Sequence, residues 1–161
     1  MSSSQPNPYL QTKVMTASTP ELRLLLFDGA LKYAQQGKAG LETTDPEAAY
    51  EGINRCQEIL IELINSLQPQ HSPELCQQLS SLYTFMYTRL VAAIGERSPA
   101  IVEEVLGLLR YERETWSMLL ERLAEENAAA GGLVDTPRAQ PPQPAHASGS
   151  SLIGGSISVK G

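Results

Sequence analysis

The residue types that carry out most enzyme chemistry are scarce in this chain and badly spaced. The two histidines, His71 and His146, have no partners at metal-ligand spacing. Glu103 and Glu104 are adjacent, so on a helix their carboxylates point roughly 100° apart, as on a solvated surface. The chain contains no Glu-x-x-His pair, no haem-attachment motif and no glycine-rich phosphate loop. We therefore expect neither an enzyme nor a metal or cofactor site.

The charge and hydropathy of the chain exclude some classes of partner. The 161 residues carry a net charge of −6, which argues against nucleic acid or an anionic membrane as a partner. The first ten residues do not resemble a secretion signal, and no stretch of about eighteen apolar residues predicts membrane insertion. We expect a cytoplasmic protein. Cys56 and Cys76 stand among apolar neighbours and are expected to be buried reduced thiols, with a disulfide or a reactive thiol as alternatives.

Helix starts recur at nearly even spacing. A small hydrogen-bonding residue precedes a proline four times, with 27, 27 and 26 residues between successive marks: Ser18 with Pro20, Asp45-Pro46, Ser72-Pro73 and Ser98-Pro99. Such a residue caps the first free N–H groups of a helix, and proline suits the first turn because it needs no donor. Glu21 completes a capping box with Ser18. The marks predict helices over about 19–41, 46–67, 73–94 and 99–128.

These segments predict an all-α fold, an antiparallel up-down four-helix bundle with an N-terminal arm and a disordered C-terminal tail. The arm is 1–17, the bundle is 18–128 and the tail is 129–161. The tail is rich in Ala, Gly, Pro and Ser and has almost no charge, so it cannot bury enough surface to order itself.

The first helix has two apolar stripes, whereas an outer helix of a four-helix bundle needs only one. Leu22, Leu25, Leu26, Gly29 and Tyr33 share the face that we expect to form the core. A second stripe contains Leu24, Phe27, Leu31 and Ala34. Either the N-terminal arm covers this stripe, or the stripe widens the core contact, or a partner helix docks on it.

Three residues on the other helices stand away from their expected core faces. Phe85 points almost opposite to the core stripe of the third helix, while Tyr50 and Ile61 lie on one shoulder of the second. Exposed apolar residues are common, so Phe85 alone does not establish a binding surface.

Three blocks of the sequence resemble the FliS family of flagellin-specific export chaperones. The first runs from Thr16 to Gln36 and includes Phe27-Asp28-Gly29-Ala30-Leu31-Lys32. The others are LYTFMYTRL (82–90) and EVLGLLRYERETW (104–116), and Tyr9 matches an upstream tyrosine. The chain departs from the family in placing proline at residue 20 rather than 19, and in having phenylalanine for common tyrosines at residues 27 and 85.

The resemblance implies a cytoplasmic chaperone without ATPase activity. It would bind the disordered C-terminal segment of flagellin, block premature polymerisation and deliver flagellin to the flagellar type III secretion system. The helix-in-groove mode would suit such a client. By position, Tyr9, with Leu10, would form part of a lid over the groove. We expect binding residues at Tyr9, Leu10, Leu24, Phe27, Leu31, Tyr50, Ile61 and Phe85.

A second function stays open on the sequence alone. The same stripe would serve a client-free structural or regulatory bundle that forms a homodimer. For the chaperone we expect a monomer or weak homodimer when free, with flagellin and the flagellar export apparatus as partners.

Overall fold

We analysed a computed structural model of the chain, which describes residues 7–16 and 19–134. Its described part is all-helical, as predicted. The five helices are α1 (Pro8–Thr16), α2 (Thr19–Glu42), α3 (Pro46–Asn65), α4 (Pro73–Glu96) and α5 (Pro99–Val134).

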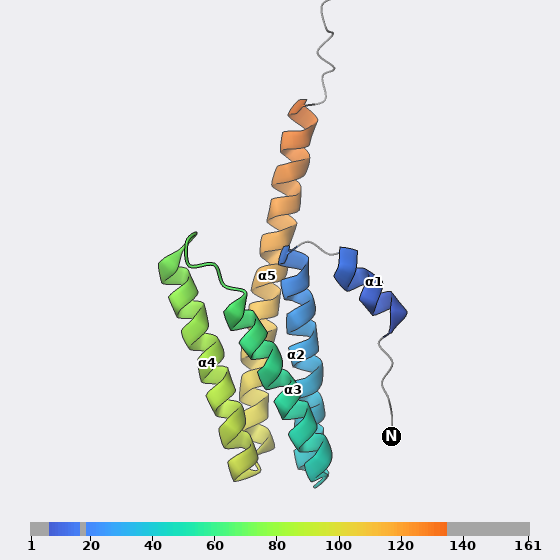
Figure 1. Cartoon of the computed structure of the whole chain (residues 1–161), viewed down its shortest axis with the longest axis vertical. Helices are drawn as coiled ribbons and strands as arrows, with labels where there is room; N and C mark the ends of the chain where they lie inside the picture. Colours follow the sequence, from blue (N-terminus) through green and yellow to red (C-terminus); the bar gives the residue numbers. More distant parts are fainter. Residues whose placement is uncertain (1–6, 17–18, 135–161) are drawn as a thin grey trace, which may run out of the picture.

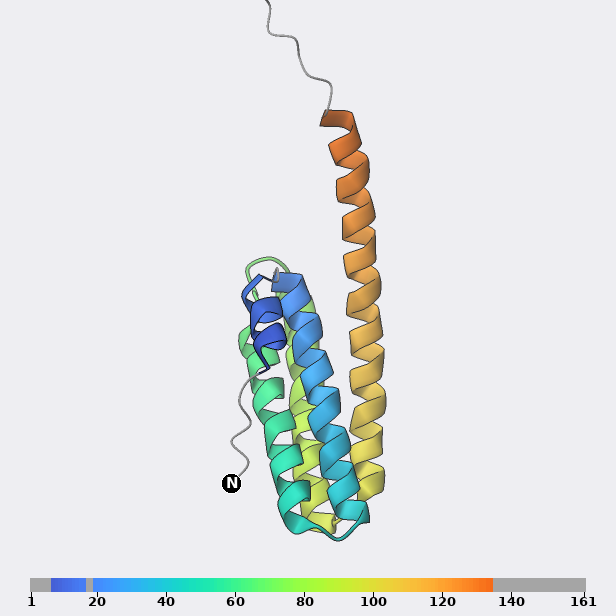
Figure 2. The same ribbon diagram turned by 90° about the vertical axis from the view of Figure 1, so that its right-hand side faces the viewer.

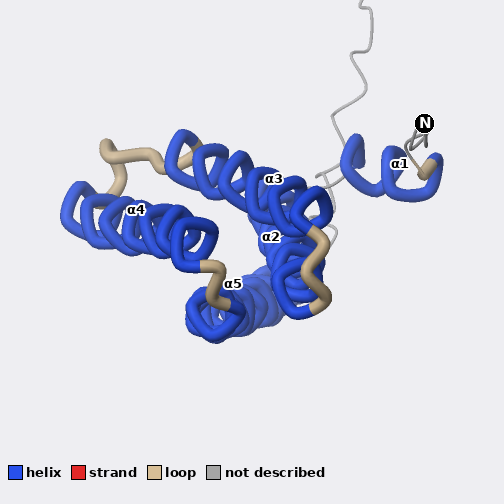
Figure 3. Tube along the Cα trace, turned by 90° about the horizontal axis from the view of Figure 1, so that it is seen from below, coloured by secondary structure: helices blue, strands red, loops and turns tan. Residues whose placement is uncertain are grey.

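Helices α2 to α5 form an antiparallel bundle with one helix at each corner (Figures 1 and 3). Each helix packs on its two neighbours, in the cyclic order α2, α3, α4, α5, whereas the diagonal pairs make at most marginal contact. Helix α1 also makes at most marginal contact and lies beside the α2 and α3 side of the bundle (Figure 1). The bundle therefore has four seams between neighbouring helices.

The cap-and-proline marks predicted the helix starts well. The Asp45 carboxylate accepts a hydrogen bond from the Ala48 N–H at 3.1 Å, and Ser98 Oγ accepts one from the Ile101 N–H at 3.4 Å. Ser72 occupies the cap position of α4, but its side chain makes no capping hydrogen bond. Ser18 lies outside the described residues.

Two element boundaries differ from the prediction. Part of the arm forms helix α1, although its sequence shows little periodicity. Helix α5 continues to Val134, six residues beyond the expected end at Ala128, because the run Ala128–Ala130 has high helix propensity. The expected disordered tail otherwise falls on residues 135–161, outside the described part of the chain.

The core lies between the four bundle helices. Its fully buried large side chains come from all four: Phe27, Ile53, Cys56, Leu60, Leu63, Tyr83, Met86, Leu90, Val102, Val105, Leu106 and Leu109. The rings of Phe27 and Tyr83 meet across the core, with centroids 6.3 Å apart.

Helices α2 and α3 approach each other through glycines. A methyl group added to Gly52 would collide with the Gly37 backbone, and one added to Gly40 would collide with the backbone of Ala49. This backbone-to-backbone contact is open only to residues without a side chain. It makes α2–α3 the most extensive helix contact in the bundle.

The second apolar stripe of α2 widens the core contact, which is one of the three interpretations that the sequence left open. Phe27 and Ala34 are fully buried, and Leu31 packs against the core, so the stripe interpreted as surplus faces the core and α5. The stripe interpreted as the core face turns toward α3, where the Gly29 backbone approaches Ile59. Because α2 has two neighbours, both stripes belong to one wide apolar arc.

A buried polar cluster joins all four helices near the end where α2 begins. The Arg23 guanidinium stacks over the Trp116 ring at 4.5 Å, and its Nη2 donates to Ser66 Oγ at 2.9 Å. Arg23 Nη1 and the Tyr83 hydroxyl are buried without a hydrogen-bond partner in the described part of the chain. Glu112 is also buried, and burial raises its pKa, an effect that the charge of Arg23 partly offsets.

We predict that Gly52→Ala destabilises the protein because its methyl group forces α2 and α3 apart. Overpacking of this kind costs roughly 1–3 kcal/mol of unfolding free energy. The matched control is Gly107→Ala, since no other group lies within 4 Å of the added methyl group. That variant should gain about 0.5–1 kcal/mol, because alanine favours the helix. Urea denaturation of both variants tests this, and equal stability would contradict the close approach.

We also predict that Glu112→Gln raises the melting temperature at pH 7 but not near pH 4. The raised pKa means that folded Glu112 keeps its proton at pH values where the unfolded chain has lost it. The unfolding free energy therefore falls as pH rises through this window, and the neutral amide removes that loss. Thermal melts of the variant and the unmodified chain from pH 4 to pH 7 measure this difference in melting temperature. A lower melting temperature at pH 7 would show instead that Arg23 stabilises the carboxylate overall.

Candidate functional site

Exposed apolar side chains line both seams beside α4. On α3, Tyr50 is 59% exposed and Ile61 43% exposed. They share the helix face of Gln57, whose Nε2 donates to the Tyr87 backbone carbonyl of α4 at 3.3 Å, so this face turns toward α4. Val91, on α4, is exposed as well. We call Tyr50, Ile61 and Val91 the α3–α4 seam residues.

The seam between α4 and α5 carries a second set. Phe85 is 47% exposed and lies one turn before Arg89, which forms an ion pair with Glu104 of α5 at 2.8 Å. Tyr111 and Met118 follow Glu104 at intervals of seven residues, and both are exposed on the solvent-facing edge of this seam. We call Phe85, Tyr111 and Met118 the α4–α5 seam residues.

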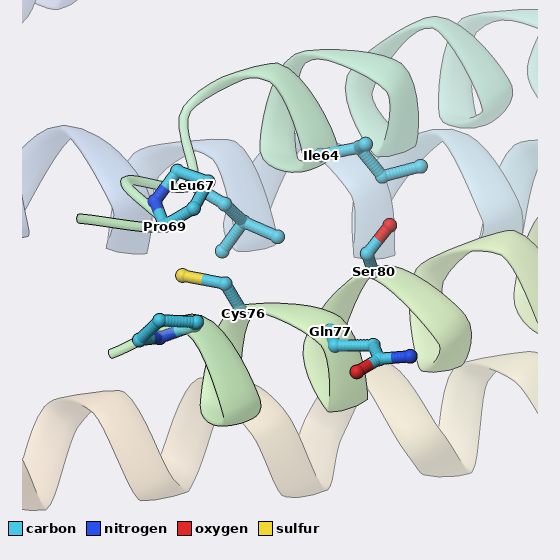
Figure 4. Close-up of a pocket in the computed structure, with 7 residues that line it drawn as sticks. Ile64, Leu67, Pro69, Cys76, Gln77 and Ser80 are labelled. Atoms are coloured by element: carbon cyan, nitrogen blue, oxygen red, sulfur yellow. The ribbon is translucent and has the colours of Figure 1, made fainter. Parts of the chain in front are cut away.

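A hollow of about 290 Å³ continues the α3–α4 seam toward the loop that joins these two helices (Figure 4). Ile64 and Leu67 line one wall, and Cys76 and Ser80 of α4 line the other. The Cys76 side chain points toward Leu67 and Pro69 (Figure 4). The hollow would admit an apolar side chain between the two helices.

The other two seams are closed along most of their length, although the α2–α5 seam opens at the first turns of α2. Glycine contacts seal α2 against α3, and ion pairs hold α5 on α2: Lys38 Nζ lies 3.0 Å from Glu103 Oε2, and Arg113 pairs with Asp28. Hydrogen bonds from Arg110 and Lys38 hold the pKa of Glu103 below its usual value. Helix α4 is therefore the element with an open seam on each side.

Three of the predicted binding residues lie on these open seams: Tyr50, Ile61 and Phe85. Tyr9 and Leu10 are exposed on α1, away from the seams, with Tyr9 75% exposed.

The predicted residues on α2 do not form an exposed groove. Phe27 is fully buried against Tyr83, and Leu31 packs on the core, so both are structural residues. Leu24 is half-buried and lies near Leu120 of α5. The prediction is wrong for Phe27 and Leu31, because α2 packs this stripe on the core and on α5, whereas Leu24 stays a predicted binding residue.

Sequence reasoning missed three exposed seam residues, namely Val91, Tyr111 and Met118. Tyr111 and Met118 carry a signal that was available: they stand seven residues apart, off the stripe that contains Val105, Leu109 and Trp116. Val91 has no comparable signal.

The described residues supply little reactive chemistry. They contain no cluster of three or more His, Cys, Asp or Glu side chains arranged to hold a metal ion. Both cysteines are free, and burial raises the pKa of the Cys56 thiol to about 12, which keeps it protonated. Among the described helices, none is long and apolar enough to cross a membrane.

Comparison with known proteins agrees with this picture of a binding bundle. A family model described as "Flagellar protein FliS" matches residues 1–123. The flagellar secretion chaperone FliS of Bacillus subtilis is 30% identical over 130 residues, covering 79% of this chain and 96% of that protein. FliS of Salmonella typhimurium is 31% identical over 111 residues, covering 68% of this chain and 82% of that protein. FliS of Campylobacter jejuni is 29% identical over 110 residues, covering 68% of this chain and 86% of that protein. The chain therefore belongs to the FliS family of flagellar secretion chaperones.

Proposed function

We propose that this chaperone binds the disordered C-terminal segment of flagellin in the two open seams beside α4. Binding would keep flagellin from polymerising in the cytosol until it is delivered to the flagellar export apparatus. The observation that carries the proposal is the exposure of large apolar side chains along both sides of a single helix.

The spacing of these side chains fits helical client segments. Tyr50 and Ile61 are separated by three helical turns, or about 16 Å, on one face of α3. Phe85 and Tyr111 mark the opposite side of α4. An amphipathic helix of similar length presents apolar residues at i, i+3, i+4 and i+7, which match a shallow apolar seam.

The energy balance also favours two seams over one. Ordering each client residue costs about 1–2 kcal/mol in backbone entropy. Burying one large apolar side chain returns about 1.5–3 kcal/mol. A disordered segment must therefore place many apolar side chains on the chaperone, and seams on both sides of α4 offer more room for them than one does. Such binding requires no catalytic group.

The rival homodimer loses the surface on which it depended. The α2 stripe is occupied by the core and by α5, with Phe27 fully buried and Leu31 packed on the core. The same burial also removes this stripe as a client groove, so it does not separate the two functions. We favour client binding because the chain belongs to the FliS family of flagellar secretion chaperones.

We further propose that α1 serves as a movable lid over a hollow at the end of the bundle that the flagellin segment also enters, beyond the two seams. The link to α2 is two residues long, and Thr19 at its end lines a hollow of about 260 Å³ beside Arg23 and Trp116. The exposed Tyr9 and Leu10 give α1 an apolar surface that could cover this end of the bundle.

We predict that Phe85→Glu and Ile61→Glu each weaken binding of a flagellin C-terminal peptide by at least about tenfold, because each puts a charge in one seam. The unfolding free energy should change by less than about 1 kcal/mol, since both positions are partly exposed. Isothermal titration calorimetry measures the affinity.

The matched control is Thr88→Glu, which adds the same charge to an exposed position of α4 outside both seams. This variant should bind like the unmodified chain. If all three variants bind equally well, the client does not use the seams. The same titration with residues 1–16 deleted tests the lid, and unchanged affinity would contradict it.

A further inference from the structure

Helix α5 is longer than the other three helices of the bundle. It has 36 residues, whereas α2, α3 and α4 have 24, 20 and 24, and its C-terminal part projects beyond its neighbours (Figures 1 and 2). Trp116 is the last α5 residue that packs on the core. Leu120 and Leu123 continue the same apolar face at intervals of four and seven residues, so this face runs on past the end of the bundle.

A notch of about 650 Å³ opens where the first turns of α2 meet this projecting part of α5. Leu24 of α2 and Leu120, Leu123 and Ala124 of α5 supply its apolar lining. Leu123 remains exposed. The notch is therefore an apolar surface left uncovered by the described residues.

The charges around the notch are acidic. Its charged lining residues, among those described, are the two glutamates Glu21 and Glu121. The surrounding stretch of α5, residues 114–131, contains four glutamates and one arginine. A complementary partner needs basic residues beside its apolar face.

A second copy of this chain does not meet that requirement. In a two-fold symmetric dimer the same patch occurs on both sides, so an antiparallel α5 pair centred on Leu123 would oppose Glu121 and Glu125 of the two copies. Like charges in an interface are repulsive. This repulsion disfavours a symmetric pair of α5 helices and favours a basic partner.

We propose that the notch is a second docking surface, which takes a short amphipathic helix with an apolar face flanked by lysine or arginine. Its apolar side chains would lie between Leu24 and Leu123, and its basic residues would face the acidic turns of α5 around Glu121. The site is separate from the seams beside α4 and does not depend on flagellin binding.

The test uses two model peptides of about four helical turns with identical leucine positions, one with lysine and one with glutamate at every polar position. Each is titrated into the full chain at physiological salt, with binding measured by calorimetry. The lysine peptide should bind, and the glutamate peptide should bind at least about tenfold more weakly. Equal binding of both peptides, or no binding of the lysine peptide, would overturn the proposal.

Variants locate the site. Glu121→Lys and Leu123→Ser should each weaken binding of the lysine peptide at least about tenfold. The matched controls are Glu62→Lys and Leu75→Ser, which make similar changes at exposed positions on α3 and α4 outside the notch and both seams. These controls should change affinity less than about twofold. An equal loss in the controls would reveal non-specific attraction to an acidic protein, and a dimer in light scattering that Leu123→Ser dissociates would identify a second copy as the occupant; either result overturns the proposal.

Discussion

The close approach of α2 and α3 at Gly37, Gly40 and Gly52 is the constraint on which the rest of the bundle depends. Because the two backbones meet directly, this seam has no room for a side chain or for a partner. The remaining apolar arc of α2 then turns toward the core and α5, where ion pairs close the second seam.

As a consequence, α4 is the most loosely packed helix of the bundle. It packs less extensively on α3 and α5 than α2 does on its own neighbours. Its seams keep Tyr50, Ile61 and Phe85 accessible to solvent. One tight pair of helices thus serves as the scaffold, and the opposite corner of the bundle presents the exposed apolar surface that we propose for the protein client.

The sequence predicted the helices and their arrangement more reliably than it predicted which neighbour each helix face contacts. Asp45 and Ser98 marked helix starts because capping is a local interaction between a side chain and N–H groups three residues away. The faces of α2 depend on which neighbours it meets, and a stripe that contacts α5 has the same periodicity as a free one. Phe27 was therefore misplaced, whereas Phe85, isolated on its helix face, was assigned correctly to the exposed side. The glycine contact also required the structure, since it depends on the register between two helices.

Hydrogen exchange of the full chain, alone and with a flagellin C-terminal segment, tests the central claim most directly. Amides of α4 and of the facing turns of α3 and α5 should become more protected on binding. Amides around Gly37 and Gly52 should exchange at an unchanged rate, because that seam is already closed. Increased protection confined to the α2–α3 seam, or no change in α4, would contradict the account.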